Sequence, residues 1–403
     1  MKRNLIVGQS GGPSAAINAT LAGVIAAAQK DERIGSVYGS RYGIEGVIHD
    51  QVLDLTDFNE LEKLKATPAM ALGSCRCKLP QDLNDPIYKM IDSIFKKYNI
   101  GYFLYIGGND SMDTVSKLNQ YYKGNPDAPA IIGLPKTIDN DLPGTDHTPG
   151  YGSAAKYLAV TMNELIRDTA IYARKAVTIV EVMGRNAGWL TLAAALPKLL
   201  GGSKPDIVAI PEIPFSETAF LDQVREKMQT TNNIVVAVSE GIRDERGEYI
   251  GCSTKSGAVD IFGHAYLSGV GKYLELLVKN EIGCKVRSIE LNLMQRCSSH
   301  LSSLADIEES FSVGEFGVEA ALAGQSGRMV VIKRLQDTPY SSAMQTVEIE
   351  EVANQEQLVP PKWFDLEDNN VKQEICRYIL PLIQGDVPKF ENAYGLNEYI
   401  IFD

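Results

Sequence analysis

The stretch YFLYIGGNDSMDTV, residues 102–115, decides the fold, because an apolar run ends in two glycines and a helix-like segment follows at once. A strand, a glycine turn and a helix in this order are typical of an α/β unit. Glycines in such a turn let backbone N–H groups approach an anion at the helix N-terminus. The acid Asp110 nevertheless stands where such an anion would be held.

The same pattern recurs along the chain. Apolar runs rich in β-branched residues end in Gly, Pro or polar residues at LIVG (5–8), AIIGLP (130–135), VTIVEVMG (177–184), DIVAIPE (206–212) and IVVAVSEG (234–241). Helical spacing of apolar residues is seen over 14–30 and 154–175. Near-continuous apolar strands alternating with helices predict doubly wound, mostly parallel α/β domains. Ligands in such folds lie beyond the carboxyl ends of the strands, where the polar motifs of this chain gather.

Length, charge and cysteine content narrow the class of protein. A chain of 403 residues predicts two or three domains. The net charge of −12 argues against binding to nucleic acid or to an anionic membrane surface. No apolar run is long enough to cross a bilayer, and the first residues do not read as a signal peptide. The six dispersed cysteines then predict reduced thiols and a cytoplasmic protein.

The loop LPKTIDNDLPGT (134–145) is the strongest candidate for chemistry. Lys136, Asp139 and Asp141 lie within six residues, between an apolar strand and a Pro-Gly turn. Two carboxylates two residues apart can divide the work, one taking a proton while the other helps to hold Mg²⁺. A lysine beside them can offset charge on a transferring phosphoryl group. The alternative is a solvated charged loop.

Two glycine turns allow both a functional and a structural interpretation. VGQSGGPSAAIN (7–18) is either a phosphate-binding turn or a tight turn followed by a helix that Ser14 caps. In GGNDS (107–111), Asn109 and Asp110 either contact a metal–phosphate group or cap a turn.

Other charged residues follow later strands. Arg185 in EVMGRNAG suits phosphate geometry, and Glu240 in AVSEG can accept hydrogen bonds from sugar hydroxyls. Arg287 and Arg296 in KVRSIELNLMQR are either ligands or a solvated basic face. His147, just past the acidic loop, is expected to be structural.

Together these motifs resemble the 6-phosphofructokinases, specifically their pyrophosphate-dependent branch. They match in order over roughly residues 1–300: GQSGGPSAAIN, GGNDS, PKTIDND, EVMGRNAGW, SEG and the arginine pair ending at Arg296. The resemblance implies reversible, Mg²⁺-dependent phosphoryl transfer from pyrophosphate to the 1-hydroxyl of fructose 6-phosphate, giving fructose 1,6-bisphosphate and phosphate. It also implies a homodimer or homotetramer.

The resemblance further implies two doubly wound α/β domains facing a cleft, with a C-terminal extension. Residues 1–150 plus about 297–345 would form a phosphoryl-donor domain. Residues 151–296 plus about 346–403 would form a sugar-phosphate domain and a C-terminal appendage.

Residue roles carry over motif by motif. Asp139 looks like the general base, and Lys136, Asp110 and Arg185 are expected to take part in catalysis beside it. The expected sugar-phosphate ligands are Thr137, Asp139, Met183, Gly184, Arg185, Glu240, Arg287 and Arg296. The expected donor-phosphate ligands are Gly12, Arg76, Asp110 and Lys136, and the expected metal ligands are Asn109 and Asp141.

The choice of phosphoryl donor depends on Asp110 and Lys136, because ATP-using relatives carry glycine at both places. Two like charges about 4 Å apart repel by roughly 4 kcal/mol at an effective dielectric constant of about 20. Asp110 is therefore expected to exclude the α-phosphate of ATP. Three departures from the family stand out: Asn109 replaces an Asp, Leu293 replaces a His or Tyr, and Ala176 replaces an Arg.

Two alternatives stay open. The first is an ATP-dependent 6-phosphofructokinase, against which Asp110 and Lys136 argue. The second is a catalytically silent regulatory subunit that binds sugar phosphates, against which the intact acidic loop argues.

Overall fold

The computed structural model describes residues 2–251 and 269–402, which form two compact units. Unit 1 takes Met1–Ser153, Arg296–Glu356 and Ile383–Asp403, and unit 2 takes Ala154–Gln295 and Gln357–Leu382. The chain passes from unit 1 to unit 2 after Ser153 and returns to unit 1 at Arg296, close to the expected boundaries at 150 and 296. The C-terminal division differs from the expectation, because residues 346–356 and 383–403 belong to unit 1 rather than to the second domain.

Long-range pairing explains this difference. The expected appendage begins at residue 346, but residues 346–348 belong to a strand, β11 (Tyr340–Glu348), which runs antiparallel to β10 (Arg328–Asp337) in unit 1. Near the C-terminus, the Ile400 N–H donates to Thr67 Oγ1 at 3.0 Å, and Phe402 packs against the core of unit 1.

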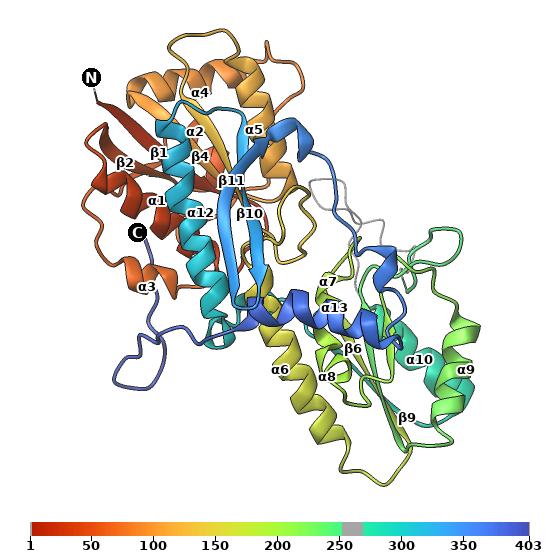
Figure 1. Ribbon diagram of the computed structural model, residues 1–403. Helices are drawn as coiled ribbons and strands as arrows, with labels where there is room; N and C mark the ends of the chain where they lie inside the picture. Colours follow the sequence, from red (N-terminus) through yellow and green to blue (C-terminus); the bar gives the residue numbers. More distant parts are fainter. Residues whose placement is uncertain (1, 252–268, 403) are drawn as a thin grey trace. The chain divides into compact units, whose positions relative to one another are not determined.

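Unit 1 is built on a seven-stranded sheet of order β11-β10-β5-β4-β1-β2-β3. Figure 1 labels β11, β10, β4, β1 and β2 of this sheet. Its other strands are β1 (Arg3–Gln9), β2 (Ile34–Ser40), β3 (Val52–Asp54), β4 (Ile100–Gly107) and β5 (Ala130–Pro135). The inner strands run parallel, while β3 and β11 at the two edges run antiparallel to their neighbours. Apolar residues face both ways along the parallel strands, as the sequence predicts for a sheet covered on both sides.

Two helical layers cover the sheet of unit 1. The helices are α1 (Ile17–Lys30), α2 (Gly43–Ile48), α3 (Leu61–Lys65), α4 (Pro86–Lys97), α5 (Asn109–Tyr121) and α12 (Leu304–Leu322), with short turns η1 (Ser299–Leu301) and η2 (Ile349–Glu351). α1 and α12 share one core with the sheet, and α2, α4 and α5 share the other. Ser303 caps α12 by accepting the Asp306 N–H, as expected of a serine at this position.

Unit 2 has a four-stranded parallel sheet of order β7-β8-β6-β9. Its strands are β6 (Ala176–Val182), β7 (Ile207–Ala209), β8 (Asn233–Ser239) and β9 (Lys285–Glu290). Its helices are α6 (Tyr151–Thr169), which begins at the unit boundary, α7 (Trp189–Ala194), α8 (Leu196–Leu199), α9 (Glu217–Lys227), α10 (Val270–Ile282), α13 (Asn369–Ile379) and η3 (Pro361–Trp363). α9 and α10 share a core with the sheet. Two short segments, α11 (Met294–Cys297) and η4 (Leu380–Ile383), lie where the chain passes between units.

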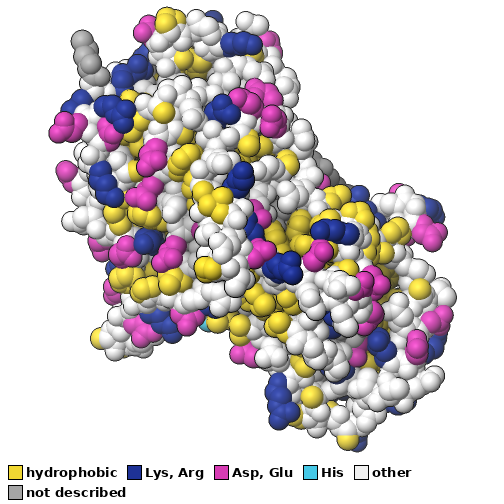
Figure 2. All heavy atoms as spheres, in the orientation of Figure 1, with side chains coloured by type: hydrophobic (Ala, Val, Ile, Leu, Met, Phe, Trp, Pro, Cys, Tyr) yellow, Lys and Arg dark blue, Asp and Glu magenta, His cyan; other side chains and the backbone are white. Residues whose placement is uncertain are grey.

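The polar motifs follow carboxyl ends of parallel strands, as predicted. In unit 1 they come after β1, β4 and β5, and in unit 2 after β6 and β8. Among the described residues, no helix combines the length and the hydrophobicity needed to cross a membrane. Figure 2 shows Lys and Arg side chains interspersed with Asp and Glu on the face drawn.

Candidate functional site

The loop after β5 folds back on itself around Asp139. The Asp139 N–H donates to Thr137 Oγ1 at 3.1 Å. Asn140 adopts a left-handed φ of 58°, and its Oδ1 accepts the Thr148 N–H at 2.9 Å. Thr148 Oγ1 in turn donates to the Thr137 carbonyl at 2.7 Å. Thr148 thus ties together the residues on either side of Asp139, which fixes the backbone that carries this carboxylate.

Lys136 joins this loop to the first glycine turn. Its side chain is buried, and Nζ donates to the Gly12 carbonyl at 2.5 Å. A Cβ on Gly11, whose φ is +81°, would lie 3.4 Å from Nζ, and one on Gly12 would lie 3.3 Å from the Arg296 guanidinium. Glycine therefore lets the turn approach two cations closely.

Opposing influences act on the pKa of Lys136. Burial lowers the pKa of Lys136 to about 8, and the Arg296 charge acts in the same direction, while Asp139 and Asp141 oppose it. The ammonium group is therefore mostly charged at neutral pH, in a dry place where its interaction with a phosphoryl oxygen is strong.

Asp141 shows the opposite effect. Burial raises its pKa, and the negative charges of Asp139 and Glu356 raise it further. A cation next to these carboxylates would relieve this repulsion, so the residues present fit a hard divalent ion. Among the described residues, no three His, Cys, Asp or Glu side chains are grouped to hold a metal unaided. Mg²⁺ characteristically takes one or two carboxylates and completes its shell with water and substrate phosphates, which agrees with this arrangement.

Asn109 has protein partners at both ends of its side-chain amide. Its Oδ1 accepts the Asn354 N–H at 2.5 Å, and its Nδ2 donates to the Gln355 carbonyl at 2.7 Å. The amide therefore anchors the segment that precedes Glu356, the residue whose charge reaches Asp141. A metal contact by Asn109 stays a prediction.

Asp110 lies in the first turn of α5, where it pairs with Lys78 at 3.1 Å between Nζ and Oδ1. Both side chains are partly exposed, 36% for Asp110 and 45% for Lys78, so solvent weakens the pair. The start of α5 lies against the first glycine turn, because Ser111 Oγ donates to Ser10 Oγ at 3.0 Å.

The segment that carries Arg76 borders the same turn. Ser74 Oγ donates to the Gly11 carbonyl at 2.7 Å, and the Gly11 N–H donates to the Cys75 carbonyl at 3.3 Å. Arg76 itself is exposed. The four expected donor-phosphate ligands are therefore carried by segments that meet at one glycine turn of unit 1.

In unit 2, the residues after β6 and β8 meet. The Gly184 N–H donates to Glu240 Oε1 at 3.4 Å, and Ser239 Oγ donates to the Gly184 carbonyl. Gly184 has a φ of +135°, and a Cβ there would lie 2.5 Å from the Ala187 carbonyl oxygen, so only glycine fits. The neighbouring Met183 N–H donates to Gln295 Oε1 at 3.1 Å.

Arg185 follows in this turn, and its buried Nε has no hydrogen-bond partner in the described structure. A buried N–H without a partner is unfavourable, and a phosphoryl oxygen is a partner of the right charge and shape.

The two remaining arginines belong to different units. Arg287 is exposed in β9, opposite Thr178 of β6, and Met183 lies five residues further along, about 16 Å at strand spacing. Arg296, expected among the sugar-phosphate ligands, belongs to unit 1 and lies beside Gly12. The chain passes from unit 2 to unit 1 at Arg296. The nine-residue spacing between Arg287 and Arg296 in the sequence does not indicate this change of unit.

Sequence reasoning missed Lys78 and Glu356. Lys78 stands two residues after Arg76 in GSCRCK, and this basic spacing beside an expected phosphate ligand was a usable signal. Glu356 gave no signal, because only the packing of a distant segment brings its charge to Asp141.

Comparisons with known proteins show which family this chain matches. Residues 4–306 match the family model described as "Phosphofructokinase". The pyrophosphate--fructose 6-phosphate 1-phosphotransferase of Halomonas elongata is 38% identical, covering 97% of this chain and 94% of its own. The enzyme of the same name from Xanthomonas campestris is 39% identical, with coverage of 98% and 95%. A crystal structure of a pyrophosphate-dependent phosphofructokinase from Nitrosospira multiformis has a TM-score of 0.85 and 34% identity, covering 99% of this chain and 96% of that one.

Proposed function

We propose, since the chain belongs to the phosphofructokinase family, that it transfers a phosphoryl group reversibly from pyrophosphate to the 1-hydroxyl of fructose 6-phosphate. The products are fructose 1,6-bisphosphate and phosphate. The main support for pyrophosphate as the donor is the buried Lys136. Its ammonium group donates a hydrogen bond to the Gly12 carbonyl, and the charges of the loop carboxylates affect its pKa. The relatives named above, which carry this activity in their names, support it.

In the proposed reaction, Asp139 takes the proton of the 1-hydroxyl group. The oxygen of that hydroxyl group forms a bond to the transferred phosphorus. The bond from that phosphorus to the bridging oxygen of pyrophosphate breaks, and phosphate leaves. Lys136 offsets the charge that develops on the leaving phosphate. Thr137 orients the loop at the sugar, and the guanidinium of Arg185, whose buried Nε has no partner in the described structure, binds a phosphoryl oxygen.

Unit 1 would hold the donor through Gly12, Arg76 and Lys136, and unit 2 would hold the sugar phosphate through Met183, Gly184, Arg185, Glu240 and Arg287. Asp141 and Asn109, together with substrate oxygens, would hold Mg²⁺, while Asp139 acts as the base. When bound, this ion would supply positive charge that neutralises the phosphoryl oxygens. We propose a soluble cytoplasmic enzyme that assembles as a homodimer or homotetramer.

The test is an initial-rate assay of the purified protein with fructose 6-phosphate and Mg²⁺, with pyrophosphate or ATP as the donor. We expect turnover with pyrophosphate and at most trace turnover with ATP. Turnover with ATP alone would overturn the choice of donor. Absence of turnover with either would favour the silent regulatory subunit.

The pH dependence of the free enzyme should report Lys136. Because its pKa is lowered to about 8, the ammonium group loses its proton as the pH rises through this value. We therefore expect kcat/KM for pyrophosphate to fall between about pH 8 and 9. In the Lys136→Arg variant, whose guanidinium stays charged, this decline should move to higher pH even though the activity is lower. A wild-type kcat/KM that is constant up to pH 9 would contradict the role of Lys136.

A further inference from the structure

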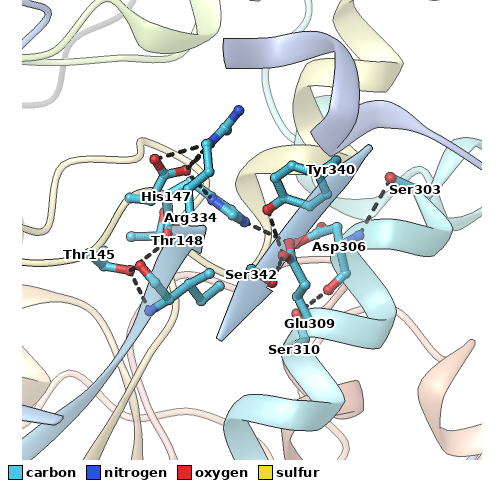
Figure 3. Close-up of polar contacts among 12 residues, drawn as sticks. Thr145, His147, Thr148, Ser303, Asp306, Glu309, Ser310, Arg334, Tyr340 and Ser342 are labelled. Carbon is cyan, nitrogen blue, oxygen red and sulfur yellow. Dashed lines mark hydrogen bonds and ion pairs between the residues drawn. The ribbon is translucent and has the colours of Figure 1, made fainter. Parts of the chain in front are cut away.

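His147 lies buried between two carboxylates in unit 1 (Figure 3). Its Nδ1 is 2.9 Å from Asp146 Oδ2, and its Nε2 is 2.8 Å from Glu309 Oε2. The imidazole is 1% exposed, so water does not compete for either nitrogen. Only the doubly protonated ring can donate to both carboxylates at once.

Each of these carboxylates is held from its other side. Arg334 of β10 donates to Asp146 from Nε at 3.1 Å and from its terminal NH2 group at 3.0 Å, and Asp337 pairs with Arg334 at 3.2 Å. From β11, Tyr340 and Ser342 donate their hydroxyls to Glu309 Oε1 at 2.6 and 2.5 Å (Figure 3). The cluster thus joins the acidic loop to α12, β10 and β11.

A further acid of α12 binds the end of the loop. Asp306 accepts the Gly150 N–H at 2.8 Å and the Ser153 N–H at 2.9 Å, and it also accepts the Ser153 hydroxyl at 2.5 Å. The charge of His147 acts to lower the pKa of this buried carboxylate, which burial raises.

The charges of the cluster favour a cationic imidazole. Burial alone would lower the pKa of His147, but the Glu309 charge and the hydrogen bonds to both acids outweigh burial and raise it to about 9. The His147 charge in turn helps to hold the pKa values of Asp146 and Glu309 below their usual range despite their burial.

A short covalent and hydrogen-bonded path leads from this ring to the reacting loop. Thr148 follows His147 directly and ties Asn140 and Thr137 together, with Asp139 between them. On the other side, Thr145 Oγ1 donates to the His147 carbonyl at 2.8 Å and accepts the Ile332 N–H of β10 at 2.9 Å. A shift of His147 therefore moves the clamp around Asp139.

We propose that His147 is a positioning residue for the transfer reaction: held as a cation between Asp146 and Glu309, it fixes the loop 137–150 so that Asp139 stays aligned with the hydroxyl. This inference rests on the proposed function, in which Asp139 is the base. Its consequence is that loss of the His147 proton, and not only loss of its shape, lowers kcat.

The first test is the Glu309→Gln variant, which removes the charge that keeps His147 protonated. We expect kcat at pH 8 to fall about 10- to 100-fold, the range seen when a supporting residue is removed, with little change in KM for pyrophosphate. The ratio of variant to wild-type kcat should rise again as the pH is lowered to 6, because His147 regains its proton. Asp337→Asn, another acid-to-amide change in the same cluster that spares both partners of His147, should not alter the pH profile.

The second test measures the proton itself. NMR of histidine-labelled protein should show one of the four imidazoles titrating near pH 9, and the His147→Gln variant should lack that signal. In Glu309→Gln the same signal should titrate at least one unit lower. This measurement needs no substrate, so it stands whatever the donor is.

Several outcomes would overturn the inference. One is that Glu309→Gln lowers the titration of His147 but leaves kcat unchanged, and another is that the loss of kcat in Glu309→Gln is equal at pH 6 and pH 8. If Glu309→Gln does not fold, His147→Gln decides: a kcat equal to wild type at pH 7 refutes the role, and a loss that lower pH does not restore supports it. Wild-type turnover with pyrophosphate, measured first, shows separately whether the proposed function fails.

Discussion

Replacing Asp139 with asparagine should lower kcat for the pyrophosphate-dependent reaction by about 10²- to 10⁴-fold. Asparagine keeps the size and polarity of the side chain but cannot accept the proton of the 1-hydroxyl. The backbone clamp through Thr137, Asn140 and Thr148 does not use the Asp139 carboxylate, so the loop should keep its shape. KM values for both substrates should therefore change little.

The measurement is steady-state kinetics in both directions, since a base in one direction is an acid in the other. Asp127→Asn, in an exposed turn after α5, is the matched control and should behave like wild type. A kcat of Asp139→Asn within a factor of about ten of wild type would show that another group takes the proton.

Replacing Asp110 with glycine should open the donor site to ATP. The repulsion of roughly 4 kcal/mol between two charges about 4 Å apart corresponds to about a thousandfold in affinity, which is an upper limit here. Lys78 pairs with Asp110 at 3.1 Å, and both are partly exposed, so part of this repulsion is already screened. We expect kcat/KM for ATP to rise by about tenfold to a thousandfold in Asp110→Gly.

Asp110→Asn separates charge from size. If the charge of Asp110 excludes ATP, Asp110→Asn should show much of the increase in kcat/KM for ATP. If the size of the side chain excludes ATP, only Asp110→Gly should show this increase. Kinetics with both donors, repeated in the Asp110→Gly, Lys136→Gly double variant, measures whether the two positions act together. If ATP stays inactive with all three variants, the explanation of donor choice from these two residues is wrong.

Local sequence patterns predicted most of the fold and the identity of the reacting loop. The apolar runs at 5–8, 102–108, 130–135, 177–184 and 234–241 lie on parallel strands, because a strand buried on both faces needs continuous apolar residues wherever it lies in the chain. Gly11 and Gly184 adopt a positive φ, which is a local requirement that favours glycine. Motif order then indicated which loops carry the chemistry.

Only the tertiary structure decided which charged side chains from distant segments lie close enough to interact. His147 and Glu309 are 162 residues apart in the chain, and nothing near either one indicates the other. The same holds for Glu356 beside Asp141, and for the strand β11 and the C-terminal tail that join unit 1. Periodicity and turn chemistry arise from neighbouring residues, whereas the charges that surround a buried ionisable group depend on which distant segments packing brings together. The sequence by itself therefore predicted which loop reacts, and the packing of α12, β10 and β11 determined how that loop is held.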